Sequence, residues 1–568
     1  AALGYNNLFV RVDILVKRGN NVELIEVKAK SFDSTEEFEP FDKRMLKAGK
    51  YSLKADYSSY LLDVAFQTYV ARKAKPEFTV SPYLMMADKS KRTSVAGLHQ
   101  LFLIQKNEVG RPTVVVKSPV PDLGAKILDR LDLREIVDRI VDSAQVEYAE
   151  SFEDLISKLT GAMASPERTL TPVSSHCKTC EFRIEKDKIA TQGKSGFEEC
   201  WMHEKALKAE DFKKELVLDI WNYRGSDKAL EQGKIYAADL DETDLKLKDR
   251  DDDKIGLSGT QRQMIQIDFA KNGKRKPYFD VEGLAAELKS FKFPMHFIDF
   301  ETTMAAIPFH AGRRPYEQIA FQFSHHVLQA DGTFEHRTEY LHDGQGTFPN
   351  FDFVRALKKA LSGDDGVVFR FAAHENTVLN QIRGQLLDST ENDKNQLVEW
   401  IESLTSPPGA DSGAWEPTRQ FVDMRDLTLR FYYLPETKGS NSIKKVLPAV
   451  LNVASTRVLD QFHDWIFRDG RGRVMDPYKI LPPIFKDVDP AELAKVEQWL
   501  SDRDELNDGG AAMMAWGRMQ FTEMSDTERA GLRKALLKYC ELDTLAMVMI
   551  YKWWDDHIKQ AASKDGIA

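Results

Sequence analysis

The chain has 568 residues, of which 42% are apolar and 30% are charged, and its formal net charge is −10. This length fits roughly three to four domain-sized units of an ordinary globular protein. Four cysteines exclude a disulfide scaffold and indicate a reducing compartment, so we expect a cytoplasmic protein. We find no signal peptide and no apolar run of about 18 residues, and we expect no membrane span. The acidic balance excludes a uniformly basic surface, although basic residues cluster at 42–54, 88–92 and 271–276.

The N-terminal part of the chain predicts a mixed α/β unit over residues 1–165. Apolar patterns predict strands at 8–16, 22–28 and 78–86, a helix at 57–74 and two helices within 125–161. Three cysteines lie in the next segment, 166–205, and the charged stretch 206–290 indicates a solvated connector.

The C-terminal part predicts a second α/β unit, over residues 291–560. Its strands are expected at 295–300, 317–328, 334–341 and 366–372, and its helices at 350–361, 374–385 and 526–558. A further strand leads into a helix at 420–431, and proline and glycine breaks indicate a helical insertion at about 455–530. The chain as a whole therefore predicts an α/β protein.

The stretch HFIDFETT (296–303) places two acids inside an otherwise apolar strand. Because residues i and i+2 of a strand share a face, Asp299 and Glu301 project together, while Ile298 and Phe300 face a core. Neighbouring buried carboxylates repel each other, and a hard cation such as Mg²⁺ or Mn²⁺ removes that cost. The spacing alone also fits a solvated strand end, so a metal site requires further ligands.

Further candidate ligands follow downstream. In VVFRFAAHENTVLNQI a strand leads into a helix that has Glu375 near its start, with His374 and Asn376 on either side. In KYCELDTLAMVMIY, Tyr539 and Asp543 stand at positions i and i+4 and share one helix face. These side chains could complete the site that the strand at 295–300 begins.

This order of motifs resembles the DEDD family of 3′–5′ exonucleases over roughly residues 293–558. The resemblance implies an RNase H-like fold in which four acids hold two metal ions and a tyrosine orients the attacking water. The acids would be Asp299, Glu301, Glu375 and Asp543, and the tyrosine would be Tyr539. In the family's second motif an asparagine usually precedes an aspartate, so Glu375 stands in for that aspartate. Asp423, in FVDMRDLTL, matches a strand-end position that we expect to be structural, as a helix cap.

The N-terminal unit carries a second group of chemically active residues, in RVDILVKRGNNVELIEVKAK. Asp13 lies on one strand, and Glu26 and Lys28 share a face of the next. Such a group can bind a metal and activate water, although an ordinary surface ion pair has the same spacing. The pattern resembles the RecB-like PD-(D/E)XK nucleases, which implies a catalytic role for these three residues and for Gln67. A histidine that many members carry upstream would precede residue 1.

The stretch HCKTCEFRIEKDKIATQGKSGFEECWMH contains Cys177, Cys180 and Cys200, a pattern typical of a metal site. We favour a [4Fe–4S] cluster, because RecB-like nucleases of the AddB and CRISPR-associated type carry three cysteines at this place and a fourth upstream of the nuclease core. The alternative is a zinc ion held by the three cysteines and His203. Cys540 is expected to be a packed helix residue.

Together with GSNSIKKVLPAVL, these motifs resemble a bacterial family of uncharacterised proteins that fuse a RecB-like domain, a cysteine cluster and a DEDD-type domain. The resemblance implies a metal-dependent nuclease with two sites, acting on DNA in preference to RNA, in DNA repair or defence against foreign DNA. The competing hypotheses are a nucleic-acid-binding scaffold of a larger complex, in which one or both sites are degenerate, and an RNA exonuclease.

Overall fold

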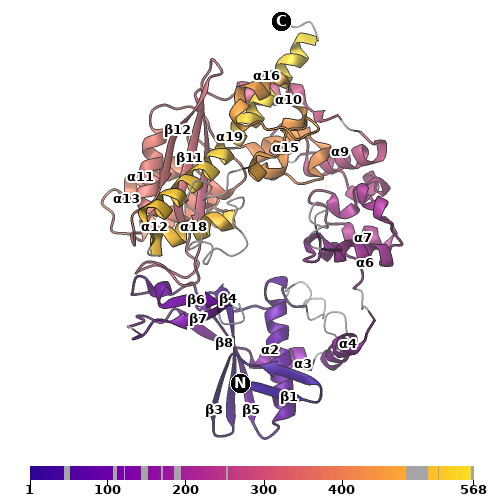
Figure 1. The fold of residues 1–568 in the computed structure, drawn as a ribbon, viewed down its shortest axis with the longest axis vertical. Helices are drawn as coiled ribbons and strands as arrows, with labels where there is room; N and C mark the ends of the chain where they lie inside the picture. The colour runs from indigo at the N-terminus through magenta and orange to yellow at the C-terminus, as the bar shows by residue number, and fades with distance from the viewer. Residues whose placement is uncertain are drawn as a thin grey trace. The chain divides into compact units, whose positions relative to one another are not determined.

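The computed structural model describes residues 1–41, 43, 52–106, 112–120, 122–142, 151–167, 171–184, 193–250, 252, 254–274, 276–480, 509–521 and 524–564. The chain divides into two compact units, shown as ribbons in Figure 1. The N-terminal unit comprises residues 1–169, 304–317 and 346–348, and the C-terminal unit comprises 170–303, 318–345 and 349–568. No helix in the part described has both the length and the apolar character needed to cross a bilayer.

The N-terminal unit is built on a four-stranded sheet. The strand order is β3-β4-β5-β8, with β3 at Ile14–Arg18, β4 at Asn21–Phe32, β5 at Thr79–Asp88 and β8 at Leu128–Asp132. β4 and β5 are parallel, so the chain needs a crossover between them, and the 20-residue helix α2 (Ala55–Ala74) is part of it. α2 buries Leu61, Val64 and Ala65 in the core of this unit.

Smaller elements complete the N-terminal unit. They are the hairpins β1 (Ala2–Tyr5)–β2 (Leu8–Arg11) and β6 (Phe102–Lys106)–β7 (Pro112–Val116), the short helix η1 (Leu98–Leu101), and the helices α3 (Arg134–Val141) and α4 (Phe152–Ala164). The single strand predicted at 8–16 is wrong, because the chain breaks between β2 and β3, where the Asp13 carboxylate accepts the N–H of Val27. The region 125–161 contains its two helices but also β8, whose alternating exposure is that of a half-buried strand.

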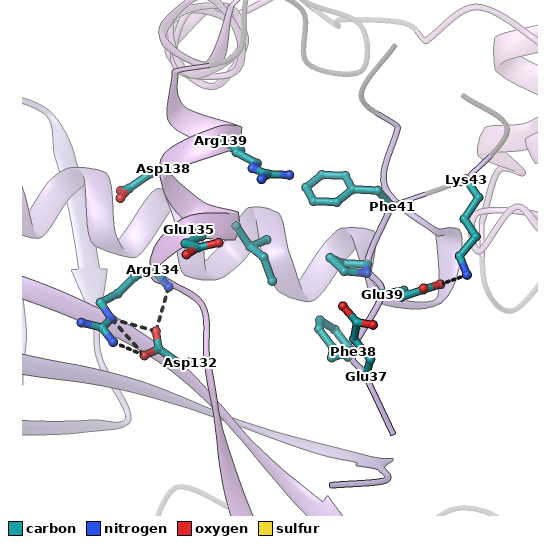
Figure 2. A pocket seen from close by; sticks show the side chains of 12 residues that line it. Glu37, Phe38, Glu39, Phe41, Lys43, Asp132, Arg134, Glu135, Asp138 and Arg139 are labelled. Carbon is teal, nitrogen blue, oxygen red and sulfur yellow. Dashed lines mark hydrogen bonds and ion pairs between the residues drawn. The ribbon is translucent and has the colours of Figure 1, made fainter. Parts of the chain in front are cut away.

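A cavity of about 790 Å³ lies between residues 37–43 and the start of α3 (Figure 2). Charged side chains of both signs line it, and several pair with each other, such as Lys43 with Glu39 and Arg134 with Asp132. None of the candidate site residues lines this cavity.

The stretch 206–290 is a packed region, so its description as a solvated connector is wrong. Its elements are η3 (Ala209–Lys213), η4 (Val217–Asp219), α7 (Ser226–Glu231), η5 (Ala237–Asp239), α8 (Glu242–Leu245), α9 (Gly259–Asn272), β9 (Tyr278–Phe279) and α10 (Val281–Lys289). Leu240 and Leu245 are buried within its most charged run, and Asp241 between them caps α8. Charged residues such as Asp241 therefore cap the starts of short helices, while the widely spaced leucines form a core.

The C-terminal unit contains a five-stranded sheet whose strand order is β12-β11-β10-β13-β14. The strands are β10 (Met295–Thr303), β11 (Ile319–Leu328), β12 (Phe334–Leu341), β13 (Val368–Arg370) and β14 (Val422–Asp423). β10, β11 and β12 are antiparallel neighbours, whereas β13 is parallel to β10 and β14 is parallel to β13. The strands predicted in this region are confirmed, apart from shifts of a few residues at their ends.

Helices cover both faces of this sheet. They are α11 (Asn350–Leu361), α12 (His374–Leu387), α13 (Lys394–Leu404), α14 (Met424–Phe431), α15 (Ile443–Val453), α18 (Gly509–Phe521) and the 39-residue α19 (Asp526–Lys564). Phe300 on one face of β10 contacts Phe353 of α11, with ring centroids 4.9 Å apart. Phe297 on the other face contacts Tyr551 of α19 at 6.1 Å. The acids of β10 alternate with Phe300 and therefore lie on the α19 face.

The remaining elements of the C-terminal unit are short. They are η2 (Ser175–Thr179), α6 (Gly196–Glu204), η6 (Gly409–Asp411), β15 (Tyr432–Tyr433), which pairs with β9, η7 (Pro435–Thr437), α16 (Thr456–Leu459), η8 (Asp460–Trp465) and η9 (Pro477–Ile480). Residues 481–508 of the predicted insertion, and most of the basic cluster at 42–54, lie outside the described residues.

Candidate functional site

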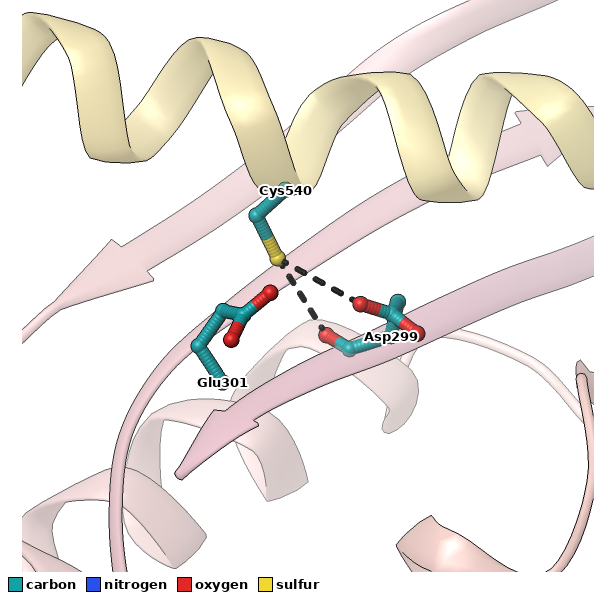
Figure 3. A group of neighbouring side chains, drawn as sticks. All are labelled: Asp299, Glu301 and Cys540. Carbon is teal, nitrogen blue, oxygen red and sulfur yellow. Dashed lines mark hydrogen bonds between the residues drawn. The ribbon is translucent and has the colours of Figure 1, made fainter. Parts of the chain in front are cut away.

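Asp299 and Glu301 lie side by side on β10, the central strand of the C-terminal sheet. Ile298 and Phe300 are buried on the opposite face, as the alternation predicts. A bulge follows Glu301, where the register with β11 shifts. Figure 3 shows both carboxylates beneath α19, and their ligand atoms lie within 4.8 Å of each other and of the Cys540 sulfur.

Glu375 is the third acid, in the first turn of α12. It is 1% exposed, and its Oε2 has no hydrogen-bond partner among the residues that the structure describes. Burial, with some repulsion from Asp423 and Asp543, raises the pKa of Glu375 to about 8. The side chains on either side of Glu375 have other partners. Asn376 bonds the backbone of Ser406, and the His374 ring lies 3.2 Å from the Thr302 hydroxyl. Glu375 is therefore the residue of this turn that belongs with the β10 acids.

Asp543 and Tyr539 both project from α19 into the same region, as their spacing predicts. Asp543 Oδ1 accepts a 2.6 Å hydrogen bond from the Tyr478 hydroxyl, and burial raises the pKa of Asp543 to about 6. The Tyr539 hydroxyl accepts a 2.8 Å hydrogen bond from Lys444 Nζ. The ammonium of Lys444 also opposes the rise in the pKa of Glu301 and Asp543, so it lies close to both acids.

The four acids form one electrostatically connected group. Burial raises the pKa values of Asp299 and Glu301 well above their usual range, and repulsion from Asp543 and Glu375 raises them further. Two cations oppose this rise, Lys444 at Glu301 and Asp543 and Arg370 at Glu375. Four acids that are buried or part-buried, and one glutamate oxygen without a partner among the described residues, fit the preference of hard divalent cations for oxygen donors.

In the C-terminal centre, the sequence did not predict Lys444 and Tyr478. Lys444 begins the stretch KKVLPAVL, but two adjacent lysines there give no sign of which one turns inward. Tyr478 lies in η9, within the predicted insertion, where no motif marks it. Asp423 fulfils its predicted role as a helix cap, since its carboxylate accepts the N–H groups of Arg425 and Asp426 at the start of α14.

The N-terminal candidates also come together, in a closed ring of hydrogen bonds. Lys28 Nζ donates to Glu26 Oε1 and to Asp63 Oδ2, each at 2.7 Å. Gln67 Nε2 donates to Glu26 Oε2 at 2.8 Å and to Asp63 Oδ1 at 3.0 Å. Asp13 is exposed, and its carboxylate accepts the N–H of Val27 rather than a bond from the members of this ring. Asp63 was not predicted, although it precedes Gln67 by one helical turn.

Part of the chain matches a known family model. Residues 296–442 match a family model described as a domain of unknown function (DUF2779). The match contains Asp299, Glu301 and Glu375 and ends two residues before Lys444. No curated protein and no solved structure matches the chain. The geometry of the side chains therefore carries the functional argument.

The cysteine segment lies in the C-terminal unit. Cys177 and Cys180, at η2, pack against the small core that includes Phe197 and Trp201 of α6. The described residues contain one group of three or more potential metal ligands within 4.8 Å of one another, and it includes none of these cysteines. The His203 ring is largely exposed and lies 3.2 Å from Glu204. The choice between an iron–sulfur cluster and zinc stays a prediction.

Proposed function

We propose that the chain is a metal-dependent nuclease whose C-terminal centre hydrolyses DNA phosphodiester bonds from a 3′ end. The observation that carries this proposal is the group of four acids with raised pKa values, of which Glu301, Glu375 and Asp543 are buried and Asp299 is part-buried. A folded chain keeps such a costly group where a bound cation or a reaction requires it. The Glu375 oxygen that lacks a partner supports the same conclusion.

The topology supports the resemblance to DEDD exonucleases and their RNase H-like fold. β10, which carries the first two acids, is the first strand of its sheet, and α12, which carries Glu375, follows the fourth strand, β13. The Tyr539–Asp543 pair lies on the last helix, which packs over β10. These are the positions that the family pattern assigns to its three motifs.

Bound divalent cations would activate water and stabilise the charge that develops on the phosphate oxygens. The four acids would hold them. An ammonium group can only donate, so Tyr539 accepts from Lys444 and its own hydroxyl proton points away from Lys444. That proton is available to orient the attacking water. Tyr478 meanwhile fixes the Asp543 carboxylate in one orientation.

The test uses a single-stranded DNA labelled at its 5′ end, incubated with Mg²⁺ or Mn²⁺. We expect a ladder of products shortened from the 3′ end with the wild-type chain, and no ladder with Asp299→Ala. Lys28→Ala serves as the matched variant of the other site and should leave the ladder intact. If the wild-type chain binds DNA but cuts it with neither metal, the scaffold hypothesis replaces the nuclease. An RNA strand of the same sequence tests the preference for DNA.

A second, RecB-like nuclease site is favoured by the ring of Glu26, Lys28, Asp63 and Gln67. The ring holds the lysine beside a carboxylate, where it can stabilise a phosphorane charge. A circular single strand has no 3′ end, so its cleavage by Asp299→Ala isolates this site. If Lys28→Ala still cleaves the circular strand, the ring of Glu26, Lys28, Asp63 and Gln67 is not a nuclease site. DNA repair and defence against foreign DNA are the settings that the combination of two nuclease sites favours.

A further inference from the structure

The centre described above is not built of oxygen alone, because Cys540 of α19 lies inside it. The Cys540 side chain is 0% exposed, and its sulfur lies 3.8 Å from Asp299 Oδ2 and 3.7 Å from the Asp299 carbonyl oxygen. Figure 3 shows the thiol pointing down from the helix between the Asp299 and Glu301 side chains. The proposed hydrolysis gives this thiol no role.

Packing alone does not account for the surroundings of the thiol. A structural cysteine normally behaves as a small apolar side chain among apolar neighbours. Cys540 instead faces two carboxylates, to which a thiol is only a weak hydrogen-bond donor. Glu375 belongs to the same electrostatic group, since its charge acts on Asp299. The residue is 1% exposed, and its Oε2 atom has no hydrogen-bond partner among the described residues. The carboxylates that face the thiol and the unpartnered Glu375 oxygen therefore indicate a centre that can take up a cation.

The chemistry of the donor set indicates which cations it distinguishes. Mg²⁺ and Mn²⁺ prefer oxygen donors, whereas a thiolate sulfur strongly favours softer cations such as Zn²⁺. Carboxylate oxygens and a thiolate are both common zinc ligands. The ligand atoms of Asp299, Glu301 and Cys540 lie within 4.8 Å of one another, so small side-chain rotations bring all three onto one ion.

We propose that Asp299, Glu301 and Cys540 form a site for a thiophilic divalent cation of the Zn²⁺ class, which displaces the hydrolytic Mg²⁺ or Mn²⁺ and stops cleavage. This inference rests on the proposed function of the same centre. As the sulfur–metal bond forms, the thiol proton passes to solvent, and the cation binds as a thiolate complex without any change of oxidation state.

The test is a titration of the full chain with Cd²⁺, whose bond to a thiolate absorbs in the ultraviolet. Thiolates of the 177–200 segment would also give a Cd²⁺ signal, so the signal of the centre is the part that Mn²⁺ competes away. We expect Cys540→Ser, which keeps the size of the side chain but supplies a hard oxygen, to lose that part and to weaken Cd²⁺ binding there at least tenfold. Cys180→Ser is the matched control and should keep it. Mn²⁺ affinity, followed by its paramagnetic signal, should change less than threefold in Cys540→Ser.

The outcomes separate the two proposals. If Cys540→Ser keeps the Mn²⁺-sensitive Cd²⁺ signal, the thiol is not a ligand and this inference is overturned. If Mn²⁺ binds neither the wild-type chain nor Cys540→Ser, the proposed function of the centre fails instead. Cys540→Ala provides the same comparison should the serine variant fail to fold. In the cleavage assay, the Zn²⁺ concentration that halves the activity should rise at least tenfold in the variant that folds.

Discussion

Glu26 in the N-terminal unit and Glu375 in the C-terminal unit are both buried glutamates at candidate sites, but their carboxyl groups differ in their hydrogen-bond partners. Both oxygens of Glu26 accept hydrogen bonds, one from Lys28 and one from Gln67. Glu375 has an oxygen without a partner among the described residues, and burial raises its pKa to about 8. The first site pairs its buried carboxylate with its own side chains, whereas the Glu375 carboxyl has no such pairing and loses its proton readily only if a cation compensates the charge.

The largest expected effect is stabilisation of the C-terminal centre by a divalent cation. With Mn²⁺ at about 100 times its dissociation constant, the metal-bound state gains about 2.7 kcal/mol of unfolding free energy. We expect hydrogen exchange in β10 and α19 to slow accordingly in the wild-type chain, and not in Asp299→Asn. Glu26→Gln is the control and should keep the protection. Equal loss of protection in both variants would mean that the two sites do not differ as described.

The pH dependence of the metal-free protein follows from the same contrast. Burial raises the pKa of Glu375 to about 8 in the folded chain, whereas the ordinary pKa of a glutamate side chain is 4.5. The unfolded state therefore binds fewer protons between these values, and stability falls as the pH rises through them, by up to about 1.4 kcal/mol per pH unit. Below pH 4.5 the contribution is fully present.

Urea unfolding in a chelator at pH 5 to 8 measures this slope. We expect Glu375→Gln to make this slope shallower, because the amide carries no proton to lose, while Asp299, Glu301 and Asp543 keep the rest of it. Glu339→Gln, at an exposed position of β12, should leave the slope unchanged. A slope that is unchanged in Glu375→Gln would assign the pH dependence to other groups.

Replacing Lys444 should have a smaller effect, and it should change the cleavage rate and the Mn²⁺ affinity differently. Its ammonium bonds the Tyr539 hydroxyl and lies near Glu301 and Asp543. Lys444→Met should lower the cleavage rate about tenfold or more, since it removes a charge-stabilising donor. It should leave Mn²⁺ affinity unchanged or raise it, because a competing positive charge is gone.

The neighbouring exposed residue provides the control, since Lys445→Met removes the same charge next to the centre. That variant should retain both the cleavage rate and the Mn²⁺ affinity. If Mn²⁺ affinity falls together with activity in Lys444→Met, the lysine holds the fold of the centre rather than acting within it.

The sequence predicts those features that depend on local pattern. The apolar spacing over 350–361 gives α11 with the observed bounds, and the i, i+2 and i, i+4 spacings of the acidic motifs place their side chains on the correct faces. The bond from Lys444 to Tyr539 spans 95 residues, and that from Tyr478 to Asp543 spans 65. Such contacts depend on how distant elements pack, so no local pattern encodes them. The connector was misjudged for a similar reason, because its core leucines are widely spaced among charges.

Asp63 should show the smallest effect and tests the N-terminal side of the contrast. The Lys28 and Asp63 side chains are 23% and 37% exposed, so solvent screens their ion pair and its loss costs about 0.2–1 kcal/mol. Asp63→Asn keeps an oxygen for Gln67 but removes the charge that holds Lys28. We expect this small loss of stability in the N-terminal unit, measured by urea unfolding, together with slower cleavage of circular DNA. Glu36→Gln, at an exposed position of the same unit, should change neither quantity. A gain in stability would show that Asp63 is an uncompensated acid, and the N-terminal site would then resemble the C-terminal one.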